Sequence, residues 1–521
     1  MLIQGDIWTG NPENPWSNAI FVENGKIRAL GEEALALAAN SPIPTLPLGD
    51  EVLVPAFGEG HAHPLYGGRE FQGPQITGLK SVSAIVAEVK RFAQAHPDDE
   101  WIVGSSYEAA IIEGGNFLAS WLDEAVSDRP VFLRAMDFHT VWVNTKALQL
   151  AGITNQTPNP QGGSIARDIL GNPEGTLREP SAIALVEKII PLRTIEDDVA
   201  ALEFALNRYR DHGVTYVQDA WVDQEILAVY EKAYAQGKCA VDVNLAFLVS
   251  PTDWQEIAPW AISARERLEK IAVTKTSHEK ILTARTIKFL CDGALSAGTA
   301  LLIDNYEDSE NRGIKIWSNE NLQAAVTYFD SLGFQVHIHA IGDGAIRQAL
   351  DAIENMQKTN PPRDRRSVIA HAQLINENDL PRFAELGVIA NIQPLWCYLD
   401  PMNKELILPR IGEQRNNSQY QLNSLLSAGV RISFGSDWPV TSEDPRLALG
   451  VPVTRVSPHE IGNSQAQPWS KEEAITIDQS LTAYTKNVAY QLFAEDRFGT
   501  LSVGAPAKFT SIPRSFFALK N

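Results

Sequence analysis

Residues 334–373 read FQVHIHAIGDGAIRQALDAIENMQKTNPPRDRRSVIAHAQ, and this stretch decides the fold. Two short apolar runs, FQVHIHA (334–340) and SVIAHAQ (367–373), flank the segment GAIRQALDAIENM, whose apolar residues recur at helical spacing. A strand, a helix and a second strand in this order are typical of a parallel sheet. The stretch therefore predicts an α/β fold.

The same alternation continues in both directions along the chain. The apolar runs that end in polar residues are LVPAF (53–57), VTYVQDA (214–220), VNLAFLV (243–249), TIKFLC (286–291), FQVHIHA (334–340), SVIAHAQ (367–373), VIANIQP (388–394) and RISFGSDWPV (431–440). Helix-like segments separate most of them. Eight runs of this kind match the strands of a closed (β/α)8 TIM barrel.

Three segments lie outside this alternation. Residues 70–200 contain a helix, a hairpin pattern and a Gly/Pro/Asn-rich stretch, so we expect a large insertion after the first barrel strand. Short strand patterns in residues 1–52 and 499–521 predict a small β-sandwich domain formed by the two ends of the chain. The barrel domain then spans residues 53–498.

Composition excludes several classes of function. The chain has 521 residues, and 44 Lys and Arg against 64 Asp and Glu give a net charge of −20. This charge opposes nucleic-acid and anionic membrane partners. Three cysteines do not make a disulfide framework, and no apolar run reaches the ~18–20 residues of a membrane-spanning helix. We expect a cytoplasmic protein.

Histidines and one aspartate mark the ends of the apolar runs. His61 and His63 form an H-x-H pair, and alternate residues of a strand point to the same side. His339, His371 and Asp437 end three later runs. Because catalytic residues project from the carboxyl ends of barrel strands, the five residues together predict a metal site. For each residue alone, a structural role is the simpler interpretation.

Lys288 lies inside the apolar run TIKFLC. Burying a lysine is costly unless the amine is paired or chemically changed. Two interpretations remain open: the side chain reaches the rim and forms a salt bridge there, or CO₂ carbamylates it and the new carboxylate bridges two divalent ions. Cys291 follows on the same run, where a small buried side chain is favoured over a soft metal ligand.

Six stretches of the sequence carry a family resemblance. They are VPAFGEGHAHP (54–64), WVNTKALQLAGI (142–153), IKFLCDGALSAGTALL (287–302), HIHAIGDGAI (337–346), IAHAQLINENDLPRFAELGVIANIQP (369–394) and FGSDWPV (434–440). Together they resemble the amidohydrolase superfamily, and specifically the branch of uncharacterised metal-dependent amidohydrolases that resembles N-substituted formamide deformylase. The stretches follow the family order, and the resemblance spans roughly residues 1–505.

The resemblance implies a hydrolase with a metal site of six residues. The implied ligands are His61, His63, Lys288 as N6-carboxylysine, His339, His371 and Asp437. Zn²⁺ is the expected cofactor, as one or two ions, with another divalent metal as the alternative. Asp437 is also the implied general base. His337, two residues before His339, is either a residue that supports a ligand or a spare ligand.

Three further residues are expected to bind substrate. The branch tends to keep a histidine in the segment of His139. Asp292 follows Lys288 closely, and its carboxylate either orients a ligand or caps the next helix. Trp396 lies on the loop after the seventh run, where an aromatic ring can wall an apolar pocket.

The sequence departs from the family pattern at four places. The usual Gly-Phe-Ile-Asp before the H-x-H pair reads Ala-Phe-Gly-Glu at residues 56–59, which changes the support beneath His61. Trp396 follows Gln-Pro where the branch often has a histidine. Residues 104–107 read Gly-Ser-Ser-Tyr in place of a Gly-Trp-rich motif, and Lys508 replaces an aspartate near the C-terminus.

The sequence predicts a metal-dependent hydrolase that cleaves a C–N, amide-type bond of a small molecule. A metal-bound hydroxide attacks the substrate, and Asp437 acts as the general base. An esterase, a lactonase or a deaminase with the same site is the alternative among enzymes. A catalytically inactive barrel scaffold is the alternative from another class. The family resemblance also suggests a homodimer.

Overall fold

The computed structural model describes residues 1–39, 44–112, 115–136, 140–160, 163–274 and 279–519. The chain divides into two compact units. One unit comprises Met1–His63 and Leu206–Asn521, and the other comprises Pro64–Ala205. The first unit contains two sheets and the second unit contains one, and each unit is described by itself.

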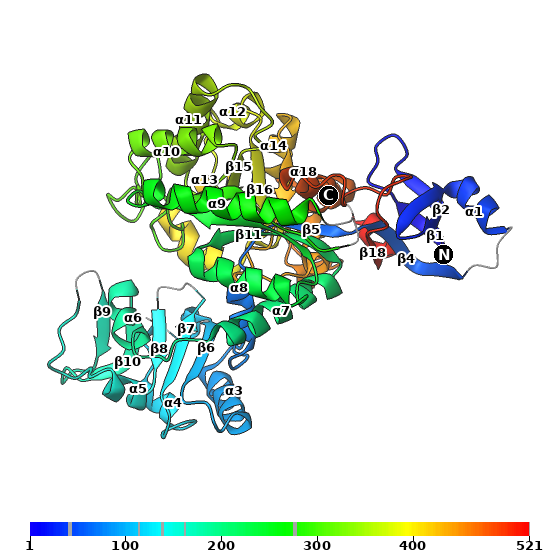
Figure 1. Ribbon diagram of the computed structural model, residues 1–521. Coiled ribbons are helices and arrows are strands. Elements are labelled where there is room, and N and C mark those ends of the chain that lie inside the picture. Colours follow the sequence, from blue (N-terminus) through cyan, green and yellow to red (C-terminus); the bar gives the residue numbers. More distant parts are fainter. Residues whose placement is uncertain (40–43, 113–114, 137–139, 161–162, 275–278, 520–521) are drawn as a thin grey trace. The chain divides into compact units, whose positions relative to one another are not determined.

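A sheet of eight parallel strands forms the centre of the first unit (Figure 1). The order of its strands is β17-β16-β15-β14-β13-β12-β11-β5. The strands are β5 (Phe57–Ala62), β11 (Val214–Val222), β12 (Asp242–Leu248), β13 (Leu282–Leu290), β14 (Gln335–Ala340), β15 (Val368–His371), β16 (Ile389–Ile392) and β17 (Ile432–Phe434). The predicted α/β fold with a parallel barrel sheet is confirmed.

The two edge strands of this sheet, β5 and β17, meet at their carboxyl ends. The N–H of Asp437 donates to the carbonyl of His61 at 2.8 Å, and the N–H of His63 donates to the carbonyl of Trp438 at 2.8 Å. These bonds nearly close the sheet, as in a TIM barrel.

The first barrel strand differs from its predicted position. Residues 53–55 of the run LVPAF belong to β4 (Thr45–Pro55) of another sheet, and β5 begins at Phe57. β5 reads FGEGHA and lacks an apolar pattern because its glycines make room for close neighbours. A Cβ at Gly58 would lie 2.6 Å from Cγ1 of Val488. The other seven predicted runs coincide with barrel strands.

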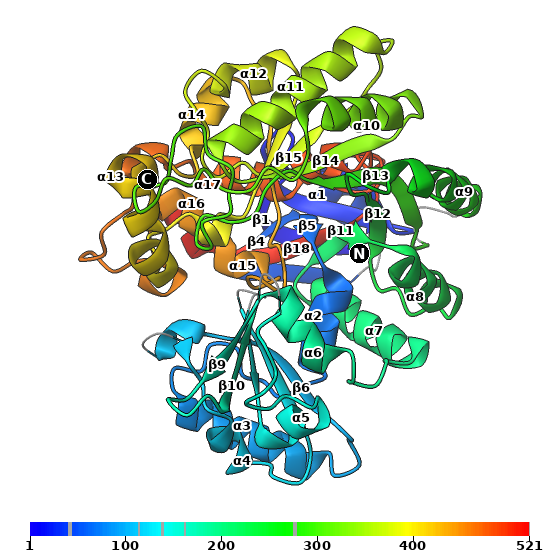
Figure 2. The same cartoon turned by 90° about the vertical axis from the view of Figure 1, so that its left-hand side faces the viewer.

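Helices surround the barrel strands (Figure 2). On α11, the buried Ile346, Leu350 and Ile353 recur at helical spacing, as the sequence predicted. Side chains of Asp223 and Ser318 cap the N-termini of α8 and α10. The helices of this unit after β11 are α8 (Gln224–Ala235), α9 (Trp254–Ala272), α10 (Asn319–Ser331), α11 (Asp343–Thr359), α12 (Leu380–Glu385), α13 (Leu408–Asn417), α14 (Leu422–Ser427), α15 (Pro445–Ala448), α16 (Val451–Thr454), α17 (Ile477–Tyr484) and α18 (Lys486–Gln491).

The two ends of the chain share a second sheet in the first unit. Its order is β18-β4-β1-β2-β3, and β18 runs antiparallel to β4. Asn24 and Gly25, with φ of 51° and 71°, form the hairpin turn between β2 and β3. The predicted β-sandwich of residues 1–52 and 499–521 stays a prediction. The elements are β1 (Leu2–Trp8), β2 (Trp16–Glu23), β3 (Lys26–Leu30), α1 (Gly31–Ala39), β4 and β18 (Phe509–Pro513).

The second unit contains a sheet of the order β6-β7-β8-β10-β9. Its apolar core includes Ile85, Val89 and Leu133, all fully buried. The bounds predicted for an insertion, residues 70–200, stay a prediction. The elements are α2 (Pro64–Phe71), α3 (Val82–Ala95), β6 (Ile102–Tyr107), α4 (Ala119–Asp123), β7 (Val131–Ala135), β8 (Thr140–Val143), α5 (Thr145–Leu150), β9 (Ser164–Arg167), β10 (Pro173–Arg178), α6 (Pro180–Glu187) and α7 (Ile195–Asp211), which continues into the first unit.

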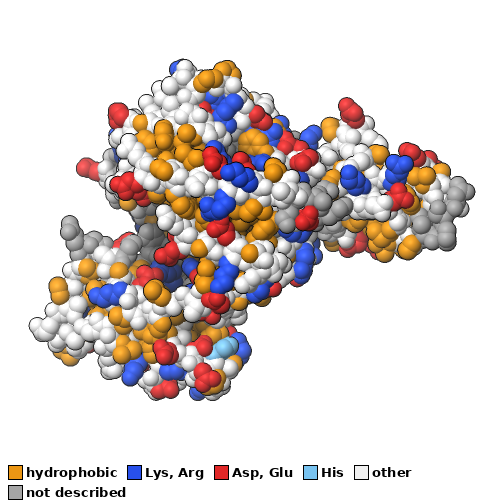
Figure 3. All heavy atoms as spheres, in the orientation of Figure 1, with side chains coloured by type: hydrophobic (Ala, Val, Ile, Leu, Met, Phe, Trp, Pro, Cys, Tyr) orange, Lys and Arg blue, Asp and Glu red, His pale blue; other side chains and the backbone are white. Residues whose placement is uncertain are grey.

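Charged side chains of both signs are interspersed on the face that Figure 3 shows. Among the described residues, no helix combines the length and the apolar character needed to cross a membrane.

Asp242 at the start of β12 joins the barrel to the C-terminal part of the chain. Its carboxylate accepts hydrogen bonds from Nε of Arg497 at 3.0 Å, Nζ of Lys508 at 2.9 Å and the N–H of Ile281 at 3.0 Å. Burial opposes the negative charge, but Lys508 and Arg497 outweigh it and hold the pKa of Asp242 below its ordinary value. Lys508, where the family pattern has an aspartate, thus has a counter-ion in the barrel.

We expect Asp242→Asn to lower the free energy of unfolding by about 3 kcal/mol, because it leaves two cations without an anionic partner. Since the pKa of Asp242 is lowered in the folded state, its contribution is present above about pH 4 and is lost as the pH falls further. Urea denaturation at neutral and acidic pH measures both effects. The control Asp6→Asn, in an exposed pair with Arg514, should cost less than about 1 kcal/mol. Equal losses for both variants would contradict the prediction.

Candidate metal centre

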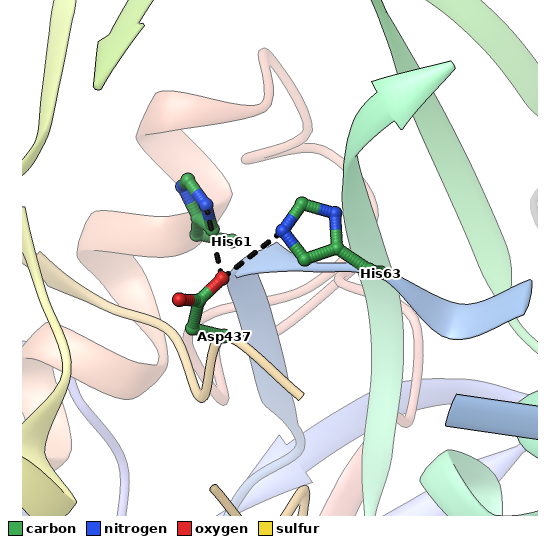
Figure 4. A group of neighbouring side chains, drawn as sticks. All are labelled: His61, His63 and Asp437. Atoms are coloured by element: carbon green, nitrogen blue, oxygen red, sulfur yellow. Dashed lines mark ion pairs between the residues drawn. The ribbon is translucent and has the colours of Figure 1, made fainter. Parts of the chain in front are cut away.

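His61, His63 and Asp437 come together at the carboxyl end of the barrel (Figure 4). His61 lies on β5, His63 follows this strand, and Asp437 follows β17. Oδ1 of Asp437 lies 3.3 Å from Nε2 of His61 and 3.1 Å from Nε2 of His63. One ligand-type atom of each residue lies within 4.8 Å of the other two. Both imidazole rings point toward the carboxylate, which is the arrangement that a shared cation requires.

Two further side chains contact the ring of His61. Nζ of Lys288 on β13 lies 3.3 Å from Nε2 of His61. On the other edge of the ring, Nε2 of His337 on β14 lies 2.8 Å from Nδ1 of His61. Lys288 therefore reaches the same cluster. His337 contacts His61, and its role as a support or as a spare ligand stays a prediction.

His339 and His371 lie beside each other next to this cluster. Their ring centroids are 4.5 Å apart, and the ring of His371 lies 4.9 Å from that of His61. Nδ1 of His371 contacts Oε1 of Gln393 at 2.8 Å. Nε2 of His339 lies 3.2 Å from the carbonyl of Gly293 and 3.4 Å from Oδ1 of Asp292. These contacts occupy one nitrogen of each ring, and the second nitrogen is the one suited to a metal.

The backbone is strained at two of these residues. His371 has a φ of 72° and Asp437 a φ of 55°, in the left-handed region that residues other than glycine rarely adopt. Such conformations cost about 1–3 kcal/mol and persist where the surrounding structure imposes them, often at functional sites. Both lie at the carboxyl end of a barrel strand, where the strain re-aims the side chain.

Glu59 holds the backbone beneath the cluster. Its carboxyl group accepts hydrogen bonds from the N–H of His61 at 3.0 Å and from the N–H of Ser436 at 2.9 and 3.1 Å. The close approach requires Gly435, since a Cβ there would lie 2.6 Å from the nitrogen of His61. Burial raises the pKa of Glu59 to about 8. The glutamate of the unusual Ala-Phe-Gly-Glu segment thus ties β5 to the residues after β17.

Comparison with known proteins decides the family. The sequence model of the Amidohydrolase family matches residues 47–521. The chain belongs to the amidohydrolase family. It is 28% identical to "Putative amidohydrolase YtcJ" of Bacillus subtilis, over 99% of this chain and 94% of that protein. It is 26% identical to "N-substituted formamide deformylase" of Arthrobacter pascens, over 99% and 93%.

A solved structure supports the same assignment. An uncharacterized metal-dependent hydrolase from Pyrococcus horikoshii is 25% identical, with a TM-score of 0.76, over 100% of this chain and 98% of that chain. The resemblance seen in the sequence is confirmed. This amidohydrolase is a hydrolase that acts on carbon–nitrogen bonds, and its metal-dependent relatives support a divalent metal.

The protonation states of the amidohydrolase's cluster fit a divalent cation. Burial holds the pKa values of His61, His337 and His371 well below the ordinary histidine value, so these rings are neutral and keep a lone pair. Burial opposes the charge of Asp437, but its hydrogen bond with His63 helps to hold its pKa below the ordinary value. Neutral imidazoles beside one carboxylate are a donor set that zinc accepts.

Lys288 is buried in this amidohydrolase, and no carboxylate of the described residues forms an ion pair with it. It is 2% exposed, and burial lowers the pKa of its amine to about 7, although Asp437 and Asp219 act in the opposite direction. An amine of this kind is neutral and nucleophilic in part near pH 7. Of the two interpretations of Lys288, this environment favours the chemically changed lysine.

The residues predicted to bind substrate have different surroundings. Asp292 is buried, and its carboxylate accepts hydrogen bonds from the N–H groups of Leu301, Ile341 and Gly342. Trp396 stacks on the ring of His371, with centroids 5.5 Å apart and planes within 3°. His139 lies outside the described residues. Substrate contact by these residues stays a prediction. Cys291 is fully buried, as favoured from the sequence.

Two residues that contact the cluster were not predicted from the sequence as site residues. The ring of Trp221, near the carboxyl end of β11, lies 6.4 Å from the ring of His63 in an edge-on arrangement. Gln393 contacts His371 from the end of β16. The signal for Gln393 was a pair of polar residues, Asn391 and Gln393, at alternate positions of an apolar run.

Proposed function

We propose that this amidohydrolase cleaves an amide-type carbon–nitrogen bond of a small molecule, with Asp437 as the general base. The convergence of His61, His63 and Asp437 at the carboxyl end of the barrel carries the proposal. The relative named N-substituted formamide deformylase supports an amide as the substrate class.

A divalent metal, with zinc as the expected ion, belongs to this proposal. The residues that would hold it are His61, His63, Lys288 as N6-carboxylysine, His339, His371 and Asp437. When bound, such an ion lowers the pKa of water and polarises the carbonyl group of the substrate.

Asp437 moves the proton in the proposed reaction. Its carboxylate is ionised and buried among imidazoles, so it is a base shielded from bulk water. It accepts a proton from the attacking water as the water oxygen bonds to the carbonyl carbon. It then returns this proton to the leaving nitrogen as the carbon–nitrogen bond breaks.

Carboxylation of Lys288 is the second part of the proposal. The neutral amine attacks CO₂, a nitrogen–carbon bond forms, and one proton is released. The product is a carboxylate on a side chain that already lies 3.3 Å from His61. Conversion of a buried amine to an anionic ligand supplies the negative charge that a second divalent ion requires.

Trp396 and Trp221 supply the proposed walls of the substrate site in the first unit. The half-buried indole of Trp396 stacks on His371, and the half-buried indole of Trp221 packs against His63. An uncharged or aromatic substituent of the amide fits between such rings. Asp292 and His139 remain proposed substrate residues, Asp292 through its contact with His339.

The proposal also includes the organisation of the chain. We propose residues 70–200 as an insertion in the barrel, residues 1–52 and 499–521 as a small β-domain, and a homodimer as the assembly. A small molecule is the partner of the active site, with no role for nucleic acid.

Asp437→Asn should keep the fold and lower kcat by about 10²–10⁴-fold, because the amide does not accept the proton. Turnover of amides, esters, lactones and aminated heterocycles is measured side by side, together with metal content by plasma mass spectrometry. The control Asp211→Asn, at an exposed position, should behave like the parent. Parent-like turnover of Asp437→Asn would remove Asp437 as the base. Parent protein that binds no metal and turns over none of these compounds would favour the inactive scaffold.

Lys288 should give one carbamate carbon signal per chain in ¹³C NMR spectra of protein supplied with ¹³C-bicarbonate. In metal-free protein this signal should grow as the pH rises through about 7, since only the neutral amine reacts and the pKa of Lys288 is lowered to about 7. Lys288→Met should abolish the signal, whereas Lys358→Met, at an exposed lysine, should keep it. A signal that survives in Lys288→Met would refute the assignment.

Trp396→Ala should lower kcat/KM for amides with an aromatic substituent by about tenfold, through the loss of one stacking surface. Amides without such a substituent should be affected less. Trp16→Ala, at an exposed position of the first unit, is the matched control. An equal effect on both substrate classes would argue against Trp396 as a substrate wall.

A further inference from the structure

The ring of His371 is one end of a chain of hydrogen bonds inside the barrel. Oε1 of Gln393 lies 2.8 Å from Nδ1 of His371, and Nε2 of Gln393 donates to Oδ1 of Asn391 at 3.2 Å. All three side chains are at most 2% exposed. The contact between ring and amide is therefore shielded from water.

The chain continues to the strand that carries His61. Nδ2 of Asn391 donates to Oγ of Ser433 at 3.0 Å and to Oε1 of Gln491 at 3.3 Å. Nε2 of Gln491, at the end of α18, donates to the carbonyl of Gly60 at 2.7 Å. Gly60 is the residue before His61, so the chain links two predicted ligands through the interior of the barrel.

The carbonyl of Gly60 fixes the direction of every bond in this chain. A carbonyl oxygen accepts hydrogen bonds but does not donate, so Gln491 must turn its NH₂ group to Gly60. Its oxygen then faces Asn391, which must donate, and the oxygen of Asn391 must accept from Gln393. Since the NH₂ group of Gln393 faces Asn391, its oxygen is the atom that faces His371. A flip of any one amide would place two donors or two acceptors against each other.

The protein leaves room for these amides. A Cβ at residue 60 would lie 2.5 Å from Nδ2 of Asn391 and 3.3 Å from Oε1 of Gln491. Gly60 therefore lacks a side chain where the chain of amides passes.

A neutral imidazole has two tautomers, and a buried acceptor selects between them. Because Oε1 of Gln393 is an acceptor, the proton of His371 is on Nδ1. The lone pair is then on Nε2, on the opposite side of the ring from Gln393, as a metal ligand requires. The other tautomer would set the lone pair of Nδ1 against the lone pairs of Gln393.

We propose that Gln393, Asn391 and Gln491 form an amide relay that holds His371 in its Nδ1-protonated tautomer. The three are positioning residues, and they act on the ligand His371 from the interior of the barrel. The relay extends the site to α18, far from His371 in sequence. Its link to metal binding rests on the proposed function, whereas the tautomer of His371 does not.

The test reads the tautomer directly, by ¹⁵N NMR of metal-free protein labelled at histidine. The signals of His371 are assigned by their loss in His371→Gln. The parent should show a protonated Nδ1 and an unprotonated Nε2. Gln393→Leu should show a mixture or the opposite tautomer, and Asn391→Leu a partial change, because the relay is cut one step further away.

A buried amide outside the relay provides the control. Gln348 on α11 is 5% exposed and donates to the carbonyl of Trp317, so Gln348→Leu should leave His371 unchanged. An unchanged tautomer in folded Gln393→Leu would overturn the inference. The inference would also be overturned if His371 kept the parent tautomer in Asn391→Leu but changed its tautomer in Gln348→Leu. Circular dichroism of each variant establishes that it is folded.

Zinc affinity, measured by competition with a chelator, separates the relay from the proposed function. Gln393→Leu should weaken zinc binding by about 10–100-fold, as expected when a support of a ligating histidine is lost. Parent protein that does not bind zinc, together with an altered tautomer in Gln393→Leu, would contradict the proposed metal site and support the relay. If the parent binds zinc but Gln393→Leu keeps the parent tautomer of His371, the result would support the proposed metal site and contradict the relay.

Discussion

The contact between the two edge strands of the barrel sheet is the interaction on which the site depends. Glu59 and Ser436 are 377 positions apart in the sequence, yet the carboxyl group of Glu59 accepts hydrogen bonds from the N–H of Ser436 and from that of His61. The same contact sets Asp437 against His61 and His63. Since the cluster takes ligand-type groups from both edge strands, the geometry of the site and the closure of the barrel are the same structural feature.

Apolar patterns predicted the fold wherever a strand is covered by apolar side chains. Seven runs, such as VNLAFLV, coincide with barrel strands because strands buried on both faces read as continuous apolar segments. The apolar pattern did not predict β5, because this strand has Gly58 and Gly60 at positions where the other strands have bulky residues. Their missing side chains make room for Val488 and Asn391. A strand whose residues allow close approach carries no hydrophobic signal, and the apolar run LVPAF before it belongs largely to β4.

The sequence also predicted which residues gather at the rim, because the carboxyl ends of parallel strands lie on one side of a barrel. It did not predict which atom of each ring faces the cluster. That depends on partners distant in sequence, such as Gln393 for His371 and His337 for His61. The unusual Lys508 is a similar case, since its counter-ion Asp242 lies 266 positions away. Sequence spacing shows which residues share a face of one strand. The orientation of their side chains depends on tertiary contacts, which the spacing does not show.

The polar interior of the barrel explains why the cluster of predicted ligands tolerates burial. Buried amides are stabilising only when each donor and acceptor is paired, and a half-paired network costs more than an apolar core. Here the amides of Asn391, Gln393 and Gln491 are joined from His371 to the backbone of Gly60. Pairing of this kind opposes rotation of the ring and supports the strained backbone at His371. In the proposed relay, the interior that stabilises the barrel also orients the predicted ligand His371, so a substitution deep in the barrel would act on the site without touching substrate.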